Sequence, residues 1–320
     1  LYTNYSDSYR QNNKLNGNLE YITMQFPIWR QHIAMSLGVT PYSAVGYDFA
    51  LTDSINSDYY YSQTYRGTGG FTQVYGGLSV NICNWLALGV NAYYMFGNIE
   101  QSRTLTFTDA SMDSVRMVET LKANSLRLRY GAQLFHTFGK HTVNLGAVFE
   151  NKQPFSRMNY EQIETTTFDT VTMRDNGFEM PMMYAVGLSY VYDNRLTVGD
   201  DYMCRDWANA NYFGQTKTLK QRHRWVVGAE YRNDPMSRKY VDQIYWRLGL
   251  NYTTAYSNRY DAAELGLSLG FGFPLRTAGT VINATVEYGK CGNKTVLSEN
   301  YLRLVINASI SEHWFFKRKL

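Results

Sequence analysis

The chain has 320 residues, a formal net charge of +4 and charged residues at only 18% of its composition, against about 25% in an average soluble domain. Aromatic residues make up 16%, and the mean hydropathy is −0.39. No stretch approaches the roughly 18 consecutive apolar residues of a membrane-spanning helix, which excludes an α-helical transporter. Basic residues are scattered apart from Lys317–Lys319, so the clustered footprint of a nucleic-acid-binding protein is missing and we expect no nucleic-acid partner.

Apolar and polar residues alternate with a period of two along almost the whole chain, which predicts strands. Thirteen full strands are expected, over residues 19–26, 31–50, 69–82, 85–102, 121–137, 141–162, 179–192, 195–205, 219–233, 241–254, 262–273, 278–288 and 299–313. Residues 1–9 supply the upper end of one more strand, so that the total is about 14, an even number as in bacterial barrels. We therefore expect one barrel domain over residues 1–320 whose first strand is incomplete at the N-terminus.

The two faces of these strands have different compositions. From Leu126 onward, apolar residues take one face while Arg127 and Arg129 take the other, and from Leu265 the opposite face is rich in Gly. A soluble β-sandwich would carry Lys, Thr and Ser on its solvent face, whereas Gly, Asn, Arg and Glu suit a crowded polar interior. An outward apolar band with aromatic girdles and a polar interior is typical of a transmembrane antiparallel β-barrel, and a soluble sandwich or an amyloid-like adhesin is the alternative.

Connections between the strands alternate in length. Short turns are expected at 83–84, 138–140, 193–194, 234–236 and 274–279, and longer polar loops around 51–68, 103–120, 163–178, 206–218, 254–261 and 289–298. Outer-membrane barrels have short periplasmic turns and longer external loops. The last strand then ends in the periplasm, with Trp314, Phe315 and Phe316 as its interfacial anchor.

Ten charged residues fall on the polar face and should point into the lumen. A narrow or blocked lumen would pair them in a network, whereas a wide pore would leave them solvated. Their mixed signs favour a blocked lumen. The residues are Arg127, Arg129, Glu150, Arg224, Glu230, Arg232, Arg247, Glu264, Glu287 and Arg303.

Several segments, in this order and spacing, resemble the outer-membrane FadL-like family of long-chain fatty-acid and hydrophobic-compound transporters, in the form common in Bacteroidota. The resembling segments are Gly17–Pro27, Ser36–Ser43, Val45–Tyr47, Val227–Tyr231, Tyr245–Tyr252, Leu269–Leu275, Val286–Gly289 and Trp314–Lys319. The resemblance implies a fourteen-stranded barrel plugged by an N-terminal hatch that carries hydrophobic molecules inward. The hatch region, often marked by an Asn-Pro-Ala segment, has no counterpart in this sequence.

Pro41 falls inside the third expected strand, where a ladder cannot accommodate it without a break because Pro has no backbone N–H. The family resemblance implies that a kink at this place opens a lateral hole, through which a ligand leaves into the bilayer. The alternative is a bulge that only improves barrel curvature. The residues assigned to this opening are Gly38, Thr40, Pro41, Tyr42, Ser43 and Gly46.

Catalytic chemistry is not expected. None of the five His has a neighbouring Ser or carboxylate at a suggestive spacing, and there is no phosphate loop or metal-ligand cluster. Asp200, Asp201 and Asp206 form the densest carboxylate group, for which solvation at a strand end is favoured over calcium binding. We expect no enzyme activity, no cofactor and no metal.

Uptake of hydrophobic small molecules across the outer membrane of a Gram-negative bacterium, with lateral exit near Pro41, is the leading hypothesis for function. The alternative is a non-transporting barrel subunit of an outer-membrane secretion or assembly complex. A simple diffusion porin is a weaker third interpretation because of the Pro41 break and the crowded lumen. The expected partners are outer-membrane lipid, hydrophobic small molecules and, for the second hypothesis, other outer-membrane or periplasmic proteins.

Overall fold

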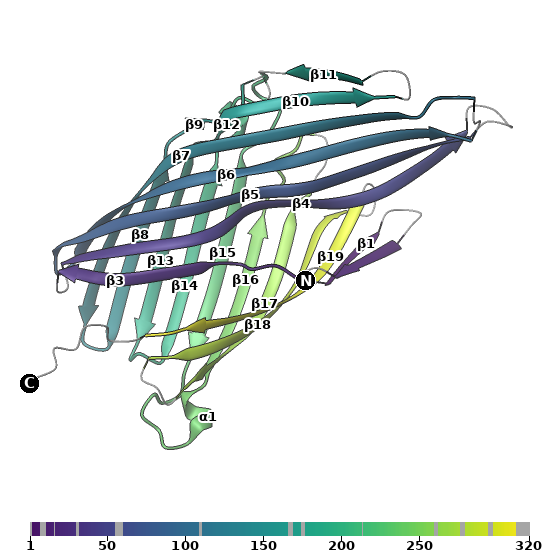
Figure 1. Cartoon of the computed structure of the whole chain (residues 1–320). Helices are drawn as coiled ribbons and strands as arrows, with labels where there is room; N and C mark the ends of the chain where they lie inside the picture. The colour runs from purple at the N-terminus through teal and green to yellow at the C-terminus, as the bar shows by residue number, and fades with distance from the viewer. Residues whose placement is uncertain are drawn as a thin grey trace, which may run out of the picture.

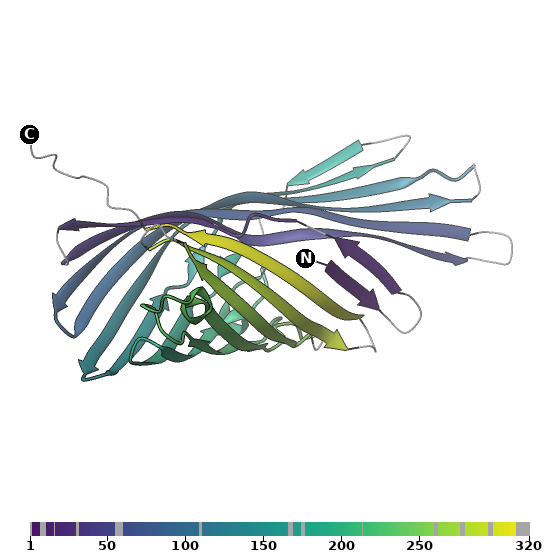
Figure 2. The same cartoon turned by 90° about the horizontal axis from the view of Figure 1, so that it is seen from below.

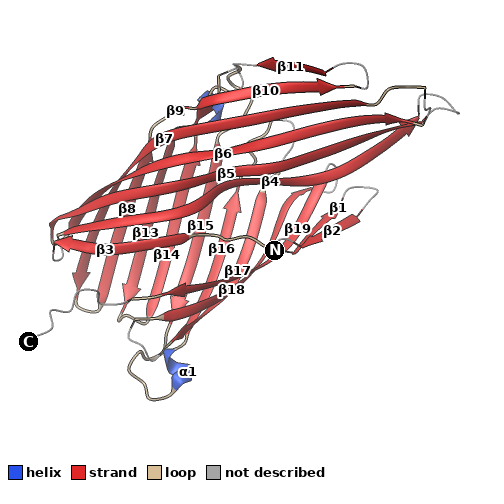
Figure 3. Cartoon of the chain, viewed as in Figure 1, coloured by secondary structure: helices blue, strands red, loops and turns tan. Residues whose placement is uncertain are grey.

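The computed structural model of the chain describes residues 2–6, 11–15, 17–29, 32–54, 60–108, 111–165, 169–173, 177–212, 214–258, 262–275, 279–293 and 297–311. Almost all of it is antiparallel β-structure (Figures 1 and 3). The strands are β1 (Tyr2–Ser6), β2 (Gln11–Leu15), β3 (Ile22–Trp29), β4 (Ile33–Ser54), β5 (Tyr60–Cys83), β6 (Leu86–Phe107), β7 (Val115–Phe138), β8 (His141–Glu150), β9 (Gln153–Pro154), β10 (Ser156–Glu164), β11 (Asp169–Met173), β12 (Glu179–Met180), β13 (Met183–Tyr192), β14 (Leu196–Arg205), β15 (Arg222–Tyr231), β16 (Tyr245–Thr253), β17 (Glu264–Pro274), β18 (Val281–Asn293) and β19 (Leu297–Ser309), with short helices η1 (Trp207–Asn209) and α1 (Tyr240–Gln243).

Seventeen of these strands form one sheet, which corrects the expected count of about 14. Strands β3 to β8 and β13 to β19 pair in sequence and make the wall. The other four are two hairpins at the end opposite the short turns, which we call the upper end: β1–β2 extends β19, and β10–β11 extends β7. The surplus over the expected count therefore comes from these hairpins.

Strands β4 to β7 are 22–24 residues long, whereas β13 to β17 have 9–11. Figure 2 shows these four strands projecting well beyond the body of the wall. Residues 51–68 and 103–120, expected as loops, are therefore largely strand where they are described. Their polar outer face misleads sequence reasoning, because a strand above the bilayer no longer needs an apolar face.

The outward face of the wall is apolar and exposed. In β13, Tyr184, Val186, Leu188, Tyr190 and Tyr192 are exposed while the residues between them are less so. Aromatic side chains gather toward the two ends of the outward face, and aliphatic ones lie between them. Among the described residues, no helix has the length and apolarity to cross a membrane. The expected anchor at Trp314, Phe315 and Phe316 lies outside the described residues.

The expected strand 141–162 is interrupted after Glu150, because β8 stops and the chain turns into the lumen. On the neighbouring strand Pro181 lies at the same level, between β12 and β13. The short pair β9–β12, with Pro154 opposite Glu179, thus lies inside the wall, and β10 then resumes pairing with β7 from Ser156. Since Pro cannot donate to a ladder, the two prolines account for this inward fold.

A β-bulge lies between Pro41 and Ser43, where β4 gains one residue against β5. The backbones of β4, β5 and β6 approach closely there: a Cβ on Gly70 would lie 2.2 Å from the Ser43 carbonyl oxygen. A Cβ on Gly97, whose φ is +151°, would lie 2.2 Å from the Gly70 carbonyl oxygen. Only glycine fits these positions, so the bulge is built into three adjacent strands.

The connection between β15 and β16 is longer than the turn expected at 234–236 and contains α1. The Asp242 carboxylate accepts hydrogen bonds from the Asn233 amide at 2.9 Å and the Ser237 hydroxyl at 2.8 Å. These bonds hold the pKa of Asp242 below its usual range. The loop is therefore ordered by its own polar side chains, whose spacing shows no strand or helix period.

The wall is not closed by pairing between its first and last strands among the described residues. The ladder of β3 with β4 ends at Ile22 and Val39, and that of β19 with β1 ends at Leu302. Between them lies a cavity of about 1020 Å³, lined by residues 17–23, Ala44–Gly46 and Arg303–Ala308. We call this region the seam.

Gly97→Ala should lower the free energy of unfolding by about 1–3 kcal/mol, because alanine at this φ is strained and meets backbone. Urea-driven unfolding of the purified protein in detergent measures this. The control is Gly131→Ala, where a Cβ meets nothing closer than 4.0 Å. Equal stability of the two variants would contradict the close approach at the bulge.

Candidate functional site: an aromatic pocket above a buried charge network

A cavity of about 620 Å³ lies in the upper lumen, beside the bulge of β4. It is bounded by the bulged strand, by β5 to β7, by the inward fold and by the loop that carries η1. Apolar atoms supply a little more than half of its lining, and Glu119, Arg205 and Arg222 are its charged residues. Its aromatic lining is Tyr42, Phe71, Phe155, Phe178, Trp207, Tyr212 and Tyr256.

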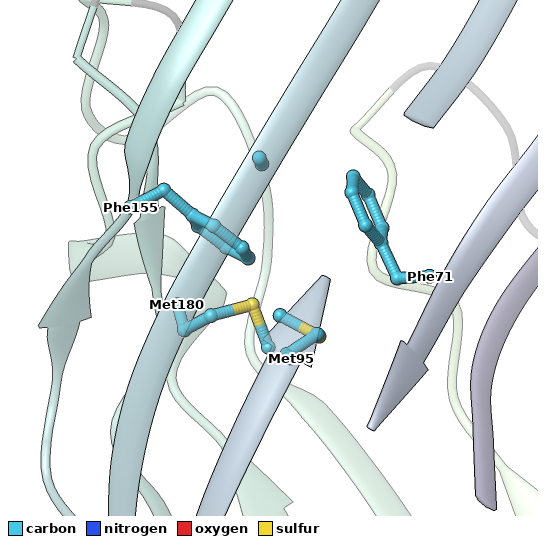
Figure 4. Packing of buried hydrophobic residues seen from close by; sticks show 5 residues of the cluster. Phe71, Met95, Phe155 and Met180 are labelled. Atoms are coloured by element: carbon cyan, nitrogen blue, oxygen red, sulfur yellow. The ribbon is translucent and has the colours of Figure 1, made fainter. Parts of the chain in front are cut away.

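A buried apolar cluster holds the inward fold against the opposite wall. Figure 4 shows Phe155 and Met180 of the inward fold pointing toward Phe71 and Met95 of β5 and β6. The ring centroids of Phe71 and Phe155 are 5.9 Å apart, and those of Phe155 and Phe178 are 5.1 Å apart. Met95 is fully buried. Side chains of the inward fold and of the facing wall therefore fill part of the lumen, while a fully blocked interior stays a prediction.

A charge network, which we call the central network, lies on the lower side of this pocket. Arg127 and Glu150, each 2% exposed, form an ion pair, and Arg129 approaches the other Glu150 oxygen at 2.9 Å. Arg127 also donates to the Gln73 amide oxygen at 2.9 Å. Arg129 donates to the Tyr93 hydroxyl at 3.1 Å. One carboxylate thus compensates two guanidinium groups from the same strand.

Tyr42, the bulged residue, links the central network to the pocket. The guanidinium carbons of Arg127 and Arg205 lie 5.0 Å and 5.8 Å from its ring centroid, a cation–π arrangement. Its hydroxyl lies 3.9 Å from the Met180 sulfur of the inward fold. The extra residue at the bulge therefore points inward and forms part of the pocket floor.

The remaining residues assigned to the lateral opening do not all converge. Thr40 accepts a hydrogen bond from Gln73 at 2.9 Å and so belongs to the central network. Ser43 lines the pocket, whereas Gly46 lines the seam. Gly38 lies lower on β4, where the Tyr75 ring covers it. Pro41 pairs with Thr72 at the bulge.

The other predicted lumen charges form separate clusters in β15 to β19. Glu230 and Arg247 pair at 2.6 Å, and Glu287 and Arg303 pair at 3.5 Å. The Tyr301 hydroxyl donates to Glu264 at 2.7 Å. Arg232 contacts the Tyr245 hydroxyl, and Arg224 is exposed on the strand β15. The single network expected from the sequence is thus split into several.

Sequence analysis missed the aromatic residues of the pocket and the glutamine that joins Thr40 to Arg127. Phe155 and Phe178 lie in segments assigned to a strand and a loop end, so alternation says nothing of their lumen position. The available signal is the pair of strand-breaking residues Pro154 and Pro181, which flank the inward fold. Asp200 and Asp201 lie on opposite faces of β14 and do not converge. Within the described ranges, no group of His, Cys, Asp or Glu could hold a metal ion.

Comparison with known families and structures gives the relationship of this chain. The sequence profile of the family described as BamG matches residues 2–320. The chain belongs to the BamG family. No curated protein matches it in sequence.

Solved structures similar to this BamG-family chain are FadL-like channels. They include the Pseudomonas putida toluene transporter TodX (TM-score 0.62, 13% identity, 95% of this chain and 85% of that chain). Two others are the CymD monoaromatic hydrocarbon channel (0.59, 11%, 98% and 87%) and a Pseudomonas aeruginosa FadL homologue (0.59, 11%, 90% and 75%). At such identities the likeness shows the fold alone, which confirms a FadL-like arrangement of the sheet and leaves barrel closure as a prediction. The Bacteroidota type stays a prediction.

Glu150→Gln should lower the free energy of unfolding by about 3–5 kcal/mol, because it leaves the buried Arg127 guanidinium and the partly exposed Arg129 guanidinium without a carboxylate. Urea-driven unfolding in detergent measures the change. Arg303→Gln is the control: its partly exposed pair at 3.5 Å should contribute only about 0–1 kcal/mol. Similar losses for both variants would argue against a special role of the central network.

The inward fold should loosen on acidification. Burial by itself raises the pKa of Glu179. Hydrogen bonds from Lys152 and from the Asn211 backbone, together with the positive charge of Lys152, lower it by more, so the pKa of Glu179 lies below its ordinary value. A lowered folded pKa gives stability that is present at neutral pH and lost as the pH falls through that pKa. The protection factors of the amides of residues 178–180 and 182, which are corrected for the intrinsic pH dependence of exchange, should therefore fall in acid, and Glu179→Gln should remove that dependence. Wild-type protection factors that do not change with pH would contradict this.

Proposed function

We propose that this BamG-family protein lies in the outer membrane of a Gram-negative bacterium, where it binds hydrophobic small molecules in the aromatic pocket and releases them sideways at the seam. One observation carries the proposal: an aromatic-lined pocket of about 620 Å³ borders the bulged β4 above a buried charge network. Pockets of this size that are lined by aromatic side chains and a few polar groups suit small apolar ligands.

The central network opposes a straight path through the lumen on this side. A hydrophobic ligand moving down would have to displace Arg127 and Glu150, each 2% exposed, and leave buried charges without partners. A smaller cavity of about 280 Å³ below it is lined by apolar side chains such as Met35 and Leu78 together with polar ones such as Ser36 and Asn91. The central network is therefore the feature that makes passage below the pocket unfavourable for an apolar molecule.

The sideways path is short. Ser43 lines the pocket, and its neighbours Ala44–Gly46 line the seam cavity. Above Val39, β4 is no longer paired with β3, although it stays paired with β5 on its other side. A ligand leaving here would pass along this unpaired edge of β4. On the side of the seam away from β4, the exposed side chains Ile22, Leu304 and Ile306 are apolar, which supports release into lipid.

Membrane placement rests on the same outward face. Exposed Leu, Val and Ile side chains cover it between two levels rich in Tyr, Trp and Phe, as in transmembrane barrels. The TodX and CymD names refer to toluene and monoaromatic hydrocarbons, which are of the ligand class proposed here. The proposed role is binding and passage, without catalysis, cofactor or metal.

Leu121→Trp should weaken binding of toluene or oleate to the purified protein by about tenfold or more, because it fills the pocket. The matched control is Leu128→Trp on the same strand, which is exposed on the outward face and should leave affinity unchanged. Intrinsic tryptophan fluorescence gives the binding curve. Failure of the wild type to bind either ligand would reject the proposal.

Ala44→Trp should separate exit from binding. It places an indole at the seam, so affinity stays the same while transfer of a fluorescent fatty acid into the bilayer of proteoliposomes slows about tenfold. Unchanged transfer would reject lateral exit and leave pocket binding intact.

A second candidate function is a non-transporting barrel subunit of an outer-membrane secretion or assembly complex. The observation that favours it is the projection of β4 to β7, since about 9–11 residues suffice to span a bilayer. The outer face of these projecting strands carries a polar hollow lined by Asp48, Arg66, Glu100 and Arg116. A polar hollow is typical of a surface that meets water or protein. Native purification followed by mass spectrometry separates the candidates: a stable protein partner with an empty pocket favours the second.

A further inference from the structure

Asp200 lies on the outward face of the wall, where its neighbours are apolar. In the antiparallel ladder it is directly opposite Leu188 of β13 and Val227 of β15. Directly paired residues share one face of a sheet, and both neighbours are exposed on the outward face, at 52% and 45%. Asp200 is itself exposed.

The depth of Asp200 follows from the aromatic residues above and below it. Tyr202 on the same strand, with Trp225 opposite it, belongs to the upper aromatic level. Tyr231, paired with Leu196, belongs to the lower level. Asp200 is two residues below Tyr202, about 7 Å along the strand, and thus lies within the aliphatic band of the wall.

No other charged residue shares this place. Among the outward positions of the described wall strands, Asp200 is the only charged residue that lies between the two aromatic levels. Lys290 also points outward, but it lies beyond Tyr288 and so past the upper level. Asp200 makes no hydrogen bond or ion pair with the described residues. Its neighbour Asp201 faces the lumen, where its carboxylate covers Gly187.

A carboxylate facing hydrocarbon is unfavourable, and ionisable residues at such depth usually pair with an opposite charge. We propose that the outward face of β13 to β15 is the docking surface for another membrane protein, which presents a Lys or Arg side chain to Asp200 within the bilayer. Ala229 lies on β15 opposite Val198, one outward position below Asp200, and its small side chain lets a partner approach closely. A second copy of this chain is disfavoured, because its described wall offers no cation at this level.

The test compares two adjacent carboxylates on opposite faces. Outer membranes are extracted in mild detergent, and the native complex is quantified by native gel and mass spectrometry. Asp200→Asn should weaken the complex at least about tenfold, as for removal of one partner of a desolvated ion pair, whereas Asp201→Asn should leave it intact. The captured protein must carry a lipid-facing Lys or Arg, and exchanging the two charges between the proteins should restore the complex.

A second measurement excludes a merely structural role. The isolated Asp200→Leu barrel should unfold at a higher urea concentration than the wild type in lipid vesicles, because an unpaired carboxylate has been removed. A lower midpoint would overturn the proposal. So would the absence of a complex from wild-type membranes, a homodimer, a bound lipid alone, or a complex insensitive to Asp200→Asn.

Discussion

The Arg127–Glu150 ion pair is the interaction on which the interior depends. Both residues are 2% exposed, and the same carboxylate also serves Arg129. A buried charge pair is tolerated only with its partners in place, so the registers of β5, β7 and β8 and the position of the bulged Tyr42 are all constrained by it. The pocket is located where this polar layer ends and aromatic side chains begin.

Proline organises the departures from a regular wall. Backbone groups within a bilayer must be paired, so a strand can be interrupted only where the freed groups are shielded. At Pro41, β4 remains paired with β5 through a one-residue bulge. At Pro154 and Pro181 the interrupted segments turn into the lumen and pair with each other as β9 and β12. The pocket lies between these two sites of interruption.

The two proposals use different parts of the wall. The ligand path lies at β4 and the seam, whereas Asp200 lies on β14, with β5 to β8 and β13 between them. A partner bound at β13 to β15 would leave the seam accessible. Ligand passage and membership of a complex are therefore compatible on one barrel.

Alternation in the sequence by itself determined the β-structure, the wall strands and which residues face outward, because lipid demands an apolar side chain at every second position. It also located the bulge, since Pro41 has no backbone N–H to donate to a ladder. It failed for β5 and β7 above the bilayer, where that demand ends, and at the inward fold, where Phe155 and Phe178 obey no strand period. Only the tertiary structure decided which charges meet: Arg127 joined Glu150, while Glu230 and Arg247 paired elsewhere. Such pairing depends on strand register and lumen curvature, which arise when distant segments of the chain come together.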